Sequence, residues 1–287
     1  MGKILILGAG MVGKAMATDL AERHQVTATD IDRKALQPLS GRRNIQTAVL
    51  DVTDHAALAA AVSGFDMVVS AVPGFLGLQT MEQVIGQRKN LVDISFLPED
   101  VQPLVALAKE NGVTVIMDCG VAPGMPNYIM GYHNEKMKIE EMDYMVGGLP
   151  KIRTFPFEYK APFSPCDVIE EYTRPARCVE NGSLVVRPAM SDAKYVHFDN
   201  IGTLEAFNTD GLRSLIQTMD HIPFMHEKTL RYPGHIQLIK ALMEAGFLDR
   251  EPIDMNGTAV IPFDVTSRIL FNAWRSGPEA PEFPVMR

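Results

Sequence analysis

Three glycines near the start of the chain have the spacing of a dinucleotide-binding loop. Gly8, Gly10 and Gly13 follow an apolar segment and precede a helical pattern. In such a loop the first glycine makes the turn, the second lets the backbone approach a pyrophosphate, and the third lets the helix pack against the strand. The N–H groups at the helix start then bind the phosphates. The residues expected to contact the dinucleotide here are Gly8, Gly10, Met11, Val12 and Gly13.

An acidic residue ends the next apolar segment. Asp30 lies about 20 residues after Gly8, where a carboxylate can accept hydrogen bonds from an adenosine ribose. A carboxylate there repels a 2′-phosphate, which favours NAD over NADP. The nearby cations Arg33 and Lys34 are the feature that would favour NADP. We give Asp30 more weight and expect NAD to be the cofactor.

Two segments of the second half combine charged or amide side chains with glycine, as binding loops do. These segments are residues 204–211 and 228–235. Arg231 can form a two-pronged contact with a substrate carboxylate, because its planar guanidinium matches that group. His235 follows a Pro-Gly pair and begins a predicted helix, so it is the histidine we select as a site residue. Surface pairing and helix capping are the alternative roles for these residues.

A carboxylate is needed if the site binds a substrate ammonium or accepts a proton. Asp118, Glu205 and Asp210 are the candidates, and each has a structural role as its alternative. The sequence contains no HxxxH or CxxC spacing, so we predict no metal site. We also find no Gly-x-Ser-x-Gly pattern, which gives no support for a serine nucleophile.

Strand and helix patterns alternate through residue 118. This alternation predicts an α/β fold with an N-terminal Rossmann domain, a doubly wound parallel sheet, over residues 1–120. Ligands of such sheets bind beyond the carboxyl ends of the strands. Strands are predicted at residues 4–7, 26–29, 47–51, 67–72, 90–93 and 114–118, and helices at residues 14–20, 55–63, 79–86 and 98–111.

The pattern changes where glycines and prolines crowd together at residues 119–127. Downstream, strands are predicted at residues 142–147 and 183–187 and a helix at 236–245, without regular alternation. We therefore expect a second, α+β domain over residues 121–287. The proline-spaced segment 277–287 is expected to have no regular structure.

Composition narrows the class of protein. The 287 residues are 46% hydrophobic and 22% charged, which suits a two-domain globular enzyme. The formal net charge of −8 disfavours binding to nucleic acid or to anionic membranes. Three cysteines without paired spacing fit a reducing compartment, and we see no leader pattern and no apolar run of membrane-spanning length. We expect a cytoplasmic protein.

Five segments together resemble the saccharopine dehydrogenase superfamily, and within it most closely the lysine 6-dehydrogenases. The resemblance rests on residues 7–13, 118–125, 147–150, 204–211 and 228–235. It implies an NAD-dependent oxidoreductase that removes the ε-amine of L-lysine to give the 6-semialdehyde. It also implies that the second domain completes the substrate site and forms the oligomer interface of a homo-oligomer, a dimer or tetramer. The alternatives are a saccharopine dehydrogenase or reductase and a non-catalytic NAD(P)-sensing protein.

The implied chemistry assigns further residues. A hydride leaves the amine-bearing carbon for the nicotinamide, and a carboxylate must first neutralise the ammonium. Asp118 is the first choice for this base and Glu205 the second. The residues expected along the nicotinamide ribose are Ser70, Ala71, Val72 and Pro73, and those expected near the adenine are Asp51 and Val52.

Overall fold

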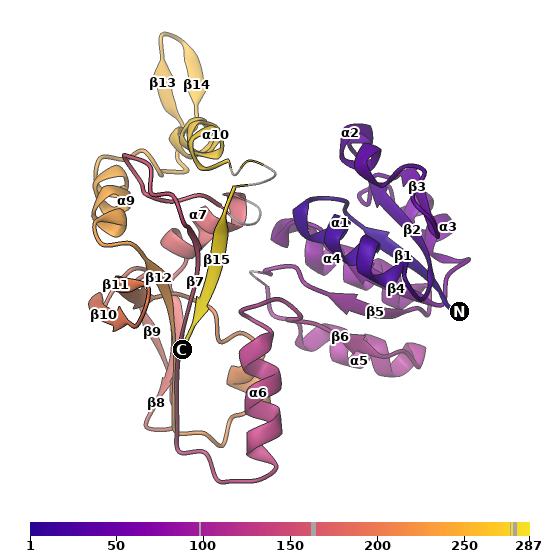
Figure 1. The fold of residues 1–287 in the computed structure, drawn as a ribbon, viewed down its shortest axis with the longest axis horizontal. Helices are drawn as coiled ribbons and strands as arrows, with labels where there is room; N and C mark the ends of the chain where they lie inside the picture. Colours follow the sequence, from indigo (N-terminus) through magenta and orange to yellow (C-terminus); the bar gives the residue numbers. More distant parts are fainter. Residues whose placement is uncertain (98, 162–164, 276, 278–279) are drawn as a thin grey trace. The chain divides into compact units, whose positions relative to one another are not determined.

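The computed structural model describes residues 1–97, 99–161, 165–275, 277 and 280–287, without the side chains of residues 165 and 166. The chain divides into two compact units, Met1–Met125 and Pro126–Arg287 (Figure 1). This boundary lies inside the glycine- and proline-rich segment at residues 119–127. No helix in the described ranges has the length and apolar character needed to cross a bilayer.

The first unit contains a parallel sheet. Among the described residues its strands are β1 (Lys3–Leu7), β2 (Gln25–Asp30), β3 (Ile45–Val49), β4 (Met67–Ser70), β5 (Asn90–Asp93) and β6 (Val115–Ile116). They lie in the order β3-β2-β1-β4-β5-β6, and every neighbouring pair is parallel. The strand order reverses between β1 and β4, which is where a doubly wound sheet binds its ligand. The predicted Rossmann-type sheet is therefore confirmed.

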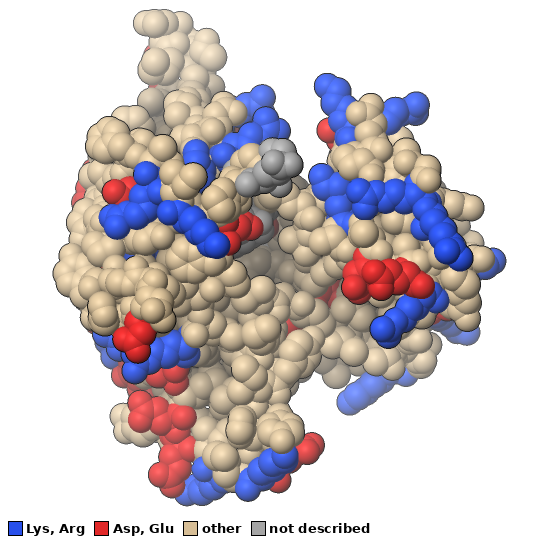
Figure 2. All heavy atoms as spheres, viewed as in Figure 1, with Lys and Arg blue, Asp and Glu red and all other residues tan. Residues whose placement is uncertain are grey.

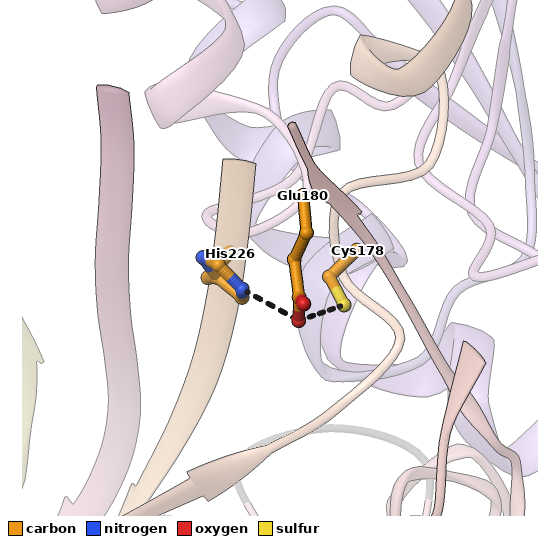
Figure 3. Close-up of side chains that lie close together, drawn as sticks. All are labelled: Cys178, Glu180 and His226. Atoms are coloured by element: carbon orange, nitrogen blue, oxygen red, sulfur yellow. Dashed lines mark hydrogen bonds and ion pairs between the residues drawn. The ribbon is translucent and has the colours of Figure 1, made fainter. Parts of the chain in front are cut away.

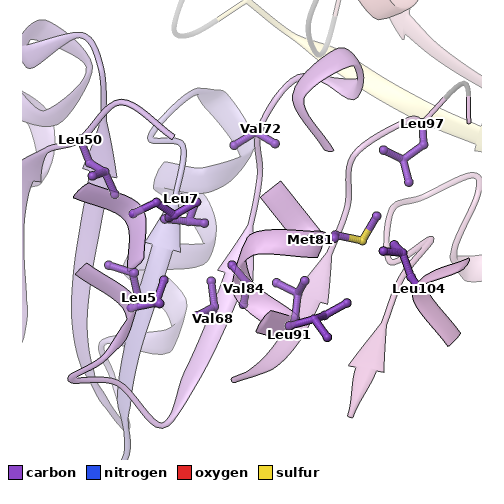
Figure 4. Packing of buried hydrophobic residues seen from close by; sticks show 13 residues of the cluster. Leu5, Leu7, Leu50, Val68, Val72, Met81, Val84, Leu91, Leu97 and Leu104 are labelled. Carbon is purple, nitrogen blue, oxygen red and sulfur yellow. The ribbon is translucent and has the colours of Figure 1, made fainter. Parts of the chain in front are cut away.

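The central strand β1 explains why helices cover both faces of this sheet. Ile4 and Ile6 pack into one apolar core, whereas Leu5 and Leu7 pack into another. Figure 4 shows the second core, where Leu5 and Leu7 lie with residues of neighbouring strands and helices. Successive side chains of a strand point to opposite faces, so four apolar residues in a row require cover on both sides.

The helices of the first unit depart from the prediction mainly at their ends. Helix α4 begins at Gly74, five residues before the predicted start at Gln79. Within this added part, Gly77 packs closely on Ser95, because a Cβ built on Gly77 would lie 2.3 Å from Ser95 Oγ. Tight packing here outweighs the low helix propensity of glycine. The predicted start at residue 98 lies outside the described residues. The helices are α1 (Met11–Leu20), α2 (Arg33–Leu36), the 3-10 helix η1 (Gln37–Leu39), α3 (His55–Val62), α4 (Gly74–Gly86) and α5 (Gln102–Asn111).

The second unit is built on a mixed sheet, which confirms the predicted α+β class. Its main path runs β10-β11-β12-β7-β15, with β8 joined to β12 and β9 joined to β8. Within the described residues the strands are β7 (Glu141–Pro150), β8 (Ala176–Glu180), β9 (Ser183–Arg187), β10 (Lys194–Phe198), β11 (Gly202–Asn208), β12 (Phe224–Arg231) and β15 (Glu282–Met286), beside a hairpin of β13 (Ile253–Met255) and β14 (Thr258–Val260). The helices are α6 (Met125–Asn134), α7 (Pro165–Thr173), α8 (Leu215–Thr218), α9 (His235–Glu244) and α10 (Pro262–Trp274).

The end of the chain corrects one prediction. Segment 277–287 was expected to have no regular structure, but its last part is strand β15, which pairs antiparallel with β7. Val285 is buried and packs with Phe283 into the core of this sheet. Pro284 is tolerated because β15 is an edge strand, where a missing N–H need not break a ladder. The alternating apolar residues therefore outweigh the prolines.

Acidic and basic side chains are interspersed over both units on the face shown in Figure 2.

Candidate functional site

The three glycines of the loop after β1 have distinct surroundings. Gly8 has φ +94°, and an added Cβ would lie 2.6 Å from the carbonyl oxygen of Ala71. At Gly13 an added Cβ would lie 2.0 Å from the carbonyl oxygen of Gly8. At Gly10 it would meet no described atom within 4 Å. The fold itself therefore requires Gly8 and Gly13, whereas the bare backbone at Gly10 faces open space and fits the approach of a pyrophosphate.

The start of helix α1 is suited to phosphate. Gly10 is its N-cap, and no side chain among the described residues caps the helix. Met11 and Val12 in the first turn are exposed, and the first turn contains no acidic residue. The N–H groups of the first turn are consequently available to an anion, with the positive end of the helix dipole behind them. This geometry agrees with a bound dinucleotide.

Charges of both signs lie at the end of strand β2. Asp30 accepts hydrogen bonds from the backbone N–H of Ala9 and of Asp32, each at 2.8 Å. Its carboxylate thereby ties the glycine loop to β2. Asp32 accepts from the backbone N–H of Lys34 at 2.8 Å and caps α2. Arg33 and Lys34 are exposed. The end of β2 and the residues that follow it thus contain both the carboxylate expected to select NAD and two cations that suit a 2′-phosphate.

Two buried polar side chains meet at the carboxyl ends of β4 and β5. Ser70 and Asp93 are paired in the sheet register, and both are fully buried. Asp93 Oδ1 accepts from the backbone N–H of Ser95 at 2.9 Å. Ser70 Oγ and Asp93 Oδ2 make no hydrogen bond of good geometry to another described atom, although the Ser70 hydroxyl is near enough to the Asp93 carboxyl to lower its pKa. Burial raises the pKa of Asp93 above its ordinary value. Buried polar atoms at the carboxyl ends of parallel strands are suited to hydrogen-bond a polar group of a cofactor or substrate.

Asp118 lies beside this pair within the first unit. The backbone N–H of Cys119 donates to the Asp93 carbonyl at 3.2 Å, and the Asp118 charge contributes to the raised pKa of Asp93. Asp118 is buried and has φ +54°, a left-handed conformation that is uncommon outside glycine. Strained backbone of this kind is frequent at functional sites. In the sequence Asp93 is the last residue of a predicted strand, 90–93, and no motif marks it as a site residue.

The other predicted cofactor contacts also follow strand ends of the first unit. Asp51 and Val52 follow β3 after one intervening residue, Leu50, and Asp51 accepts from Thr53 Oγ1 at 2.7 Å. Hydrogen bonds from Thr53 lower the pKa of Asp51. The segment of Ala71, Val72 and Pro73 comes directly after β4. The carbonyl oxygen of Ala71 packs against Gly8, where an added Cβ would lie 2.6 Å from it. Their contacts with adenine and nicotinamide ribose remain predictions.

In the second unit, two predicted site residues are joined by a tyrosine. Arg231 Nε donates to the Tyr172 hydroxyl at 3.0 Å, and that hydroxyl lies 2.9 Å from His235 Nε2. His235 Nδ1 lies 2.9 Å from the carbonyl oxygen of Phe157, which can only accept, so Nδ1 carries the proton. Nε2 therefore accepts from Tyr172. Burial lowers the pKa of His235 to about 3, so its ring is neutral.

The guanidinium of Arg231 has further partners inside this unit. Its Nη2 donates to Glu171 Oε2 at 2.8 Å, and its Nη1 donates to the carbonyl of Leu230 at 3.0 Å. The Tyr159 ring centroid lies 4.4 Å from its Cζ. Arg231 is only 3% exposed. Its predicted contact with a substrate carboxylate stays a prediction, whereas its contacts with α7 and the aromatic core are direct observations.

Glu205 is brought near Arg231 but is bonded elsewhere. The two residues are opposite each other on β11 and β12. The Glu205 carboxylate accepts from the backbone N–H of Gly234 at 3.3 Å and from Gln237 Nε2 at 3.0 Å. Glu205 therefore binds the start of α9, the helix that His235 begins. The third carboxylate candidate, Asp210, pairs with Arg177 at 2.8 Å.

A buried glutamate was missed by the sequence analysis. Glu227 Oε2 accepts from Thr209 Oγ1 at 2.6 Å and from the backbone N–H of Gly211 at 3.0 Å. Burial raises its pKa from an ordinary 4.5 to about 8. Glu227 lies between His226 and Lys228 in the sequence, so no adjacent apolar residue marks it as buried. Its burial follows from packing beside β7 and the residues that follow β11.

The raised pKa of Glu227 predicts a pH-dependent stability. Burial favours the neutral form of the Glu227 carboxyl. Its contribution to the free energy of unfolding is therefore fully present below about pH 4.5 and is lost as the pH rises through about 8. We expect Glu227→Gln, which cannot ionise, to lose less unfolding free energy than the wild type between about pH 5 and 8. Urea unfolding at several pH values measures this difference. Parallel curves for the two proteins would refute it, and the exposed Glu82→Gln is the control.

Two family models match consecutive parts of the chain. The "Saccharopine dehydrogenase NADP binding domain" matches residues 4–116, and the "Saccharopine dehydrogenase C-terminal domain" matches residues 120–287. The first corresponds to the glycine loop and its parallel sheet, and the second corresponds to the mixed sheet. A nicotinamide dinucleotide is thus supported, but the expected preference for NAD is not.

Curated relatives are longer than this chain. Saccharopine dehydrogenase (NADP(+), L-glutamate-forming) of Schizosaccharomyces pombe is 29% identical over 290 residues, covering 94% of this chain and 64% of that protein. Alpha-aminoadipic semialdehyde synthase of Arabidopsis thaliana is 25% identical over 286 residues, covering 86% of this chain and 27% of that protein. The chain therefore spans less than two thirds of the length of either relative.

Solved structures with a similar fold include two enzymes. Apo saccharopine dehydrogenase (L-Glu forming) of Saccharomyces cerevisiae matches with a TM-score of 0.68 at 24% identity, covering 88% of this chain and 62% of that one. Homospermidine synthase of Legionella pneumophila in complex with NAD matches with a TM-score of 0.59 at 14% identity, covering 85% and 68%. At these identities the likeness establishes the fold alone.

Proposed function

Because the chain belongs to the saccharopine dehydrogenase family, we propose that it is an NADP-dependent oxidoreductase acting on the carbon–nitrogen bond of a saccharopine-type secondary amine. The observation that carries this proposal is the match of both family models, in order, over residues 4–116 and 120–287. The named relatives are saccharopine dehydrogenases and semialdehyde synthases, so lysine 6-dehydrogenase activity has less support.

The proposed reaction balances as an oxidation followed by hydrolysis. A carbon next to the secondary nitrogen gives up a hydride, and the nitrogen gives up a proton. Water then adds to the resulting C=N bond and divides the substrate into an aldehyde and a primary amine. A bound nicotinamide supplies the hydride acceptor. The protein must bind both molecules, orient them and accept the proton.

The residues of the first unit suit those tasks. The loop at Gly10 and the first turn of α1 bind the pyrophosphate through backbone N–H groups. Asp118 accepts the proton of the substrate nitrogen, as a carboxylate at the ligand edge of the sheet can do. Asp93, whose pKa is raised by burial, and Ser70 offer polar atoms to the bound molecules. These assignments extend the roles expected from the sequence.

The proposed preference for NADP rests on Arg33 and Lys34. The double variant Arg33→Ala, Lys34→Ala is expected to weaken NADP binding about tenfold, the equivalent of one charge-assisted hydrogen bond, with little change for NAD. Fluorescence titration of both cofactors measures this, with the exposed Lys109→Ala as control. If the wild type instead binds NAD more tightly and Asp30→Ala narrows the difference, Asp30 sets the preference, as the sequence suggested.

The proposed activity is tested by following reduced-nicotinamide absorbance with saccharopine and L-lysine, each offered with NADP and NAD. We expect saccharopine with NADP to give the highest kcat/KM. Turnover of lysine alone would replace this proposal by lysine 6-dehydrogenase activity. Tight cofactor binding without turnover of either amine would indicate a cofactor-sensing protein.

A further inference from the structure

Three side chains with metal-binding atoms converge in the second unit (Figure 3). Cys178 and Glu180 lie on β8, and His226 lies on β12. Val179 and Met225 are direct partners across these antiparallel strands, so their side chains lie on one face of the sheet. The side chains of the neighbouring residues Cys178, Glu180 and His226 therefore lie together on the other face. Cys178 Sγ lies 3.7 Å and His226 Nε2 lies 3.4 Å from Glu180 Oε1. The strands themselves therefore hold the three groups together.

These separations agree with a tetrahedral zinc site. Zinc bonds of about 2.0–2.3 Å at tetrahedral angles place sulfur, nitrogen and oxygen ligands about 3.3–3.6 Å apart. The sulfur–oxygen and nitrogen–oxygen distances are within about 0.2 Å of that range. All three ligand atoms lie within 4.8 Å of one another. An ion can enter with small side-chain shifts.

The chemistry of the three groups is also that of zinc ligands. Thiolate, imidazole and carboxylate are the protein groups that bind this ion. The His226 and Glu180 side chains are 28% and 26% exposed, so an ion in solution can reach them. We propose that Cys178 Sγ, Glu180 Oε1 and His226 Nε2 bind one Zn²⁺ ion, with water in the fourth position. On binding, the Cys178 thiol gives its proton to solvent and its sulfur bonds to the metal.

Arg187 is the neighbouring cation that must be accommodated. Its Nη2 donates at 2.8 Å to each oxygen of Glu180. Zinc at Oε1 replaces the contacts that Cys178 and His226 now make with that atom, and also those from Arg187 Nε at 3.2 Å and Nη2 at 2.8 Å. The contact between Nη2 and Oε2 can persist. Arg187 then orients the ligating carboxylate, as outer-shell partners of metal ligands do.

The site joins two strands that have little other connection. Within the described residues, β8 pairs with β12 at one register position. A zinc ion ligated from both strands would fasten β8 to the strand that ends at Arg231. The sequence predicts no metal site here, because Cys178 and His226 are far apart in the chain and have no motif spacing. The proposed site does not rest on the proposed oxidoreductase activity.

Cobalt titration tests the proposal, because Co²⁺ substitutes for zinc and its bond to thiolate absorbs in the near ultraviolet. We expect the reduced, metal-free protein to bind one Co²⁺ with this band, and Zn²⁺ to remove it by displacement. Cys178→Ser should abolish the band, and His226→Gln should weaken binding at least tenfold. Zn²⁺ should also raise the thermal midpoint of the wild type but not of these variants.

The matched controls are Cys119→Ser and His221→Gln, which alter the same residue types outside the cluster. Both should bind cobalt as the wild type does. Should Cys178→Ser fail to fold, His226→Gln alone decides the matter. Absence of the band at millimolar Co²⁺, or a band that survives both Cys178→Ser and His226→Gln, overturns the proposal.

Discussion

Gly10→Val is expected to abolish dinucleotide binding while leaving the protein folded. A Cβ at this position would meet no described atom within 4 Å, so the chain itself has room for it. The added side chain would instead occupy the space where the pyrophosphate approaches the backbone of the loop. Cofactor titration by fluorescence and thermal unfolding without cofactor together measure the two halves of this prediction.

Gly13→Ala is the matched control, because it adds one methyl group in the same loop. Its Cβ would lie 2.0 Å from the Gly8 carbonyl oxygen, so helix and strand must separate. Overpacking of this kind costs about 1–3 kcal/mol, and we expect lowered stability there. Normal cofactor binding by Gly10→Val would show that the loop is not the pyrophosphate site.

Arg231→Met is expected to destabilise the protein by about 3–5 kcal/mol, because it leaves the Glu171 carboxylate without its buried partner. The same change removes the hydrogen bond to Tyr172 and with it the support of His235. Urea unfolding of the variant and the wild type, without cofactor or substrate, measures the loss. The double variant Arg231→Met, Glu171→Gln should recover part of it.

Arg231→Lys separates this structural role from the role expected from the sequence. A lysine keeps the charge but cannot reproduce the bonds to Tyr172, Glu171 and the Leu230 carbonyl. We expect lowered stability. Unchanged stability with a strongly raised KM would instead identify Arg231 as the group that binds the substrate carboxylate.

The first unit was largely predictable because its signals are local. The apolar run at residues 4–7, the glycine spacing and the strand ends that follow all report on short-range structure. Alternation of strands and helices then leaves few possible topologies. The loop geometry at Gly8 and Gly13 agrees with the role that the pattern assigns to each glycine.

The second unit was less predictable because its polar contacts are long-range. Tyr172 meets His235 across 63 positions of sequence, and neither residue's neighbours indicate the contact. Glu227 is buried where β12 lies between β7 and the residues that follow β11. The prolines of the last segment predict irregular structure, because proline lacks the N–H that a strand needs. Burial of Val285 instead favours the strand β15. Sequence patterns thus identify candidate residues more readily than their partners.

The most direct test of the proposed oxidoreductase activity is isotope transfer. Saccharopine carrying deuterium at the carbon that becomes the aldehyde is offered with NADP⁺, and the reduced cofactor is analysed by mass spectrometry. We predict that the wild type gives reduced cofactor that carries the deuterium, and that Gly10→Val gives none. Reduced cofactor without deuterium, or no reduction by the wild type at any substrate concentration, would contradict hydride transfer from this carbon–nitrogen bond.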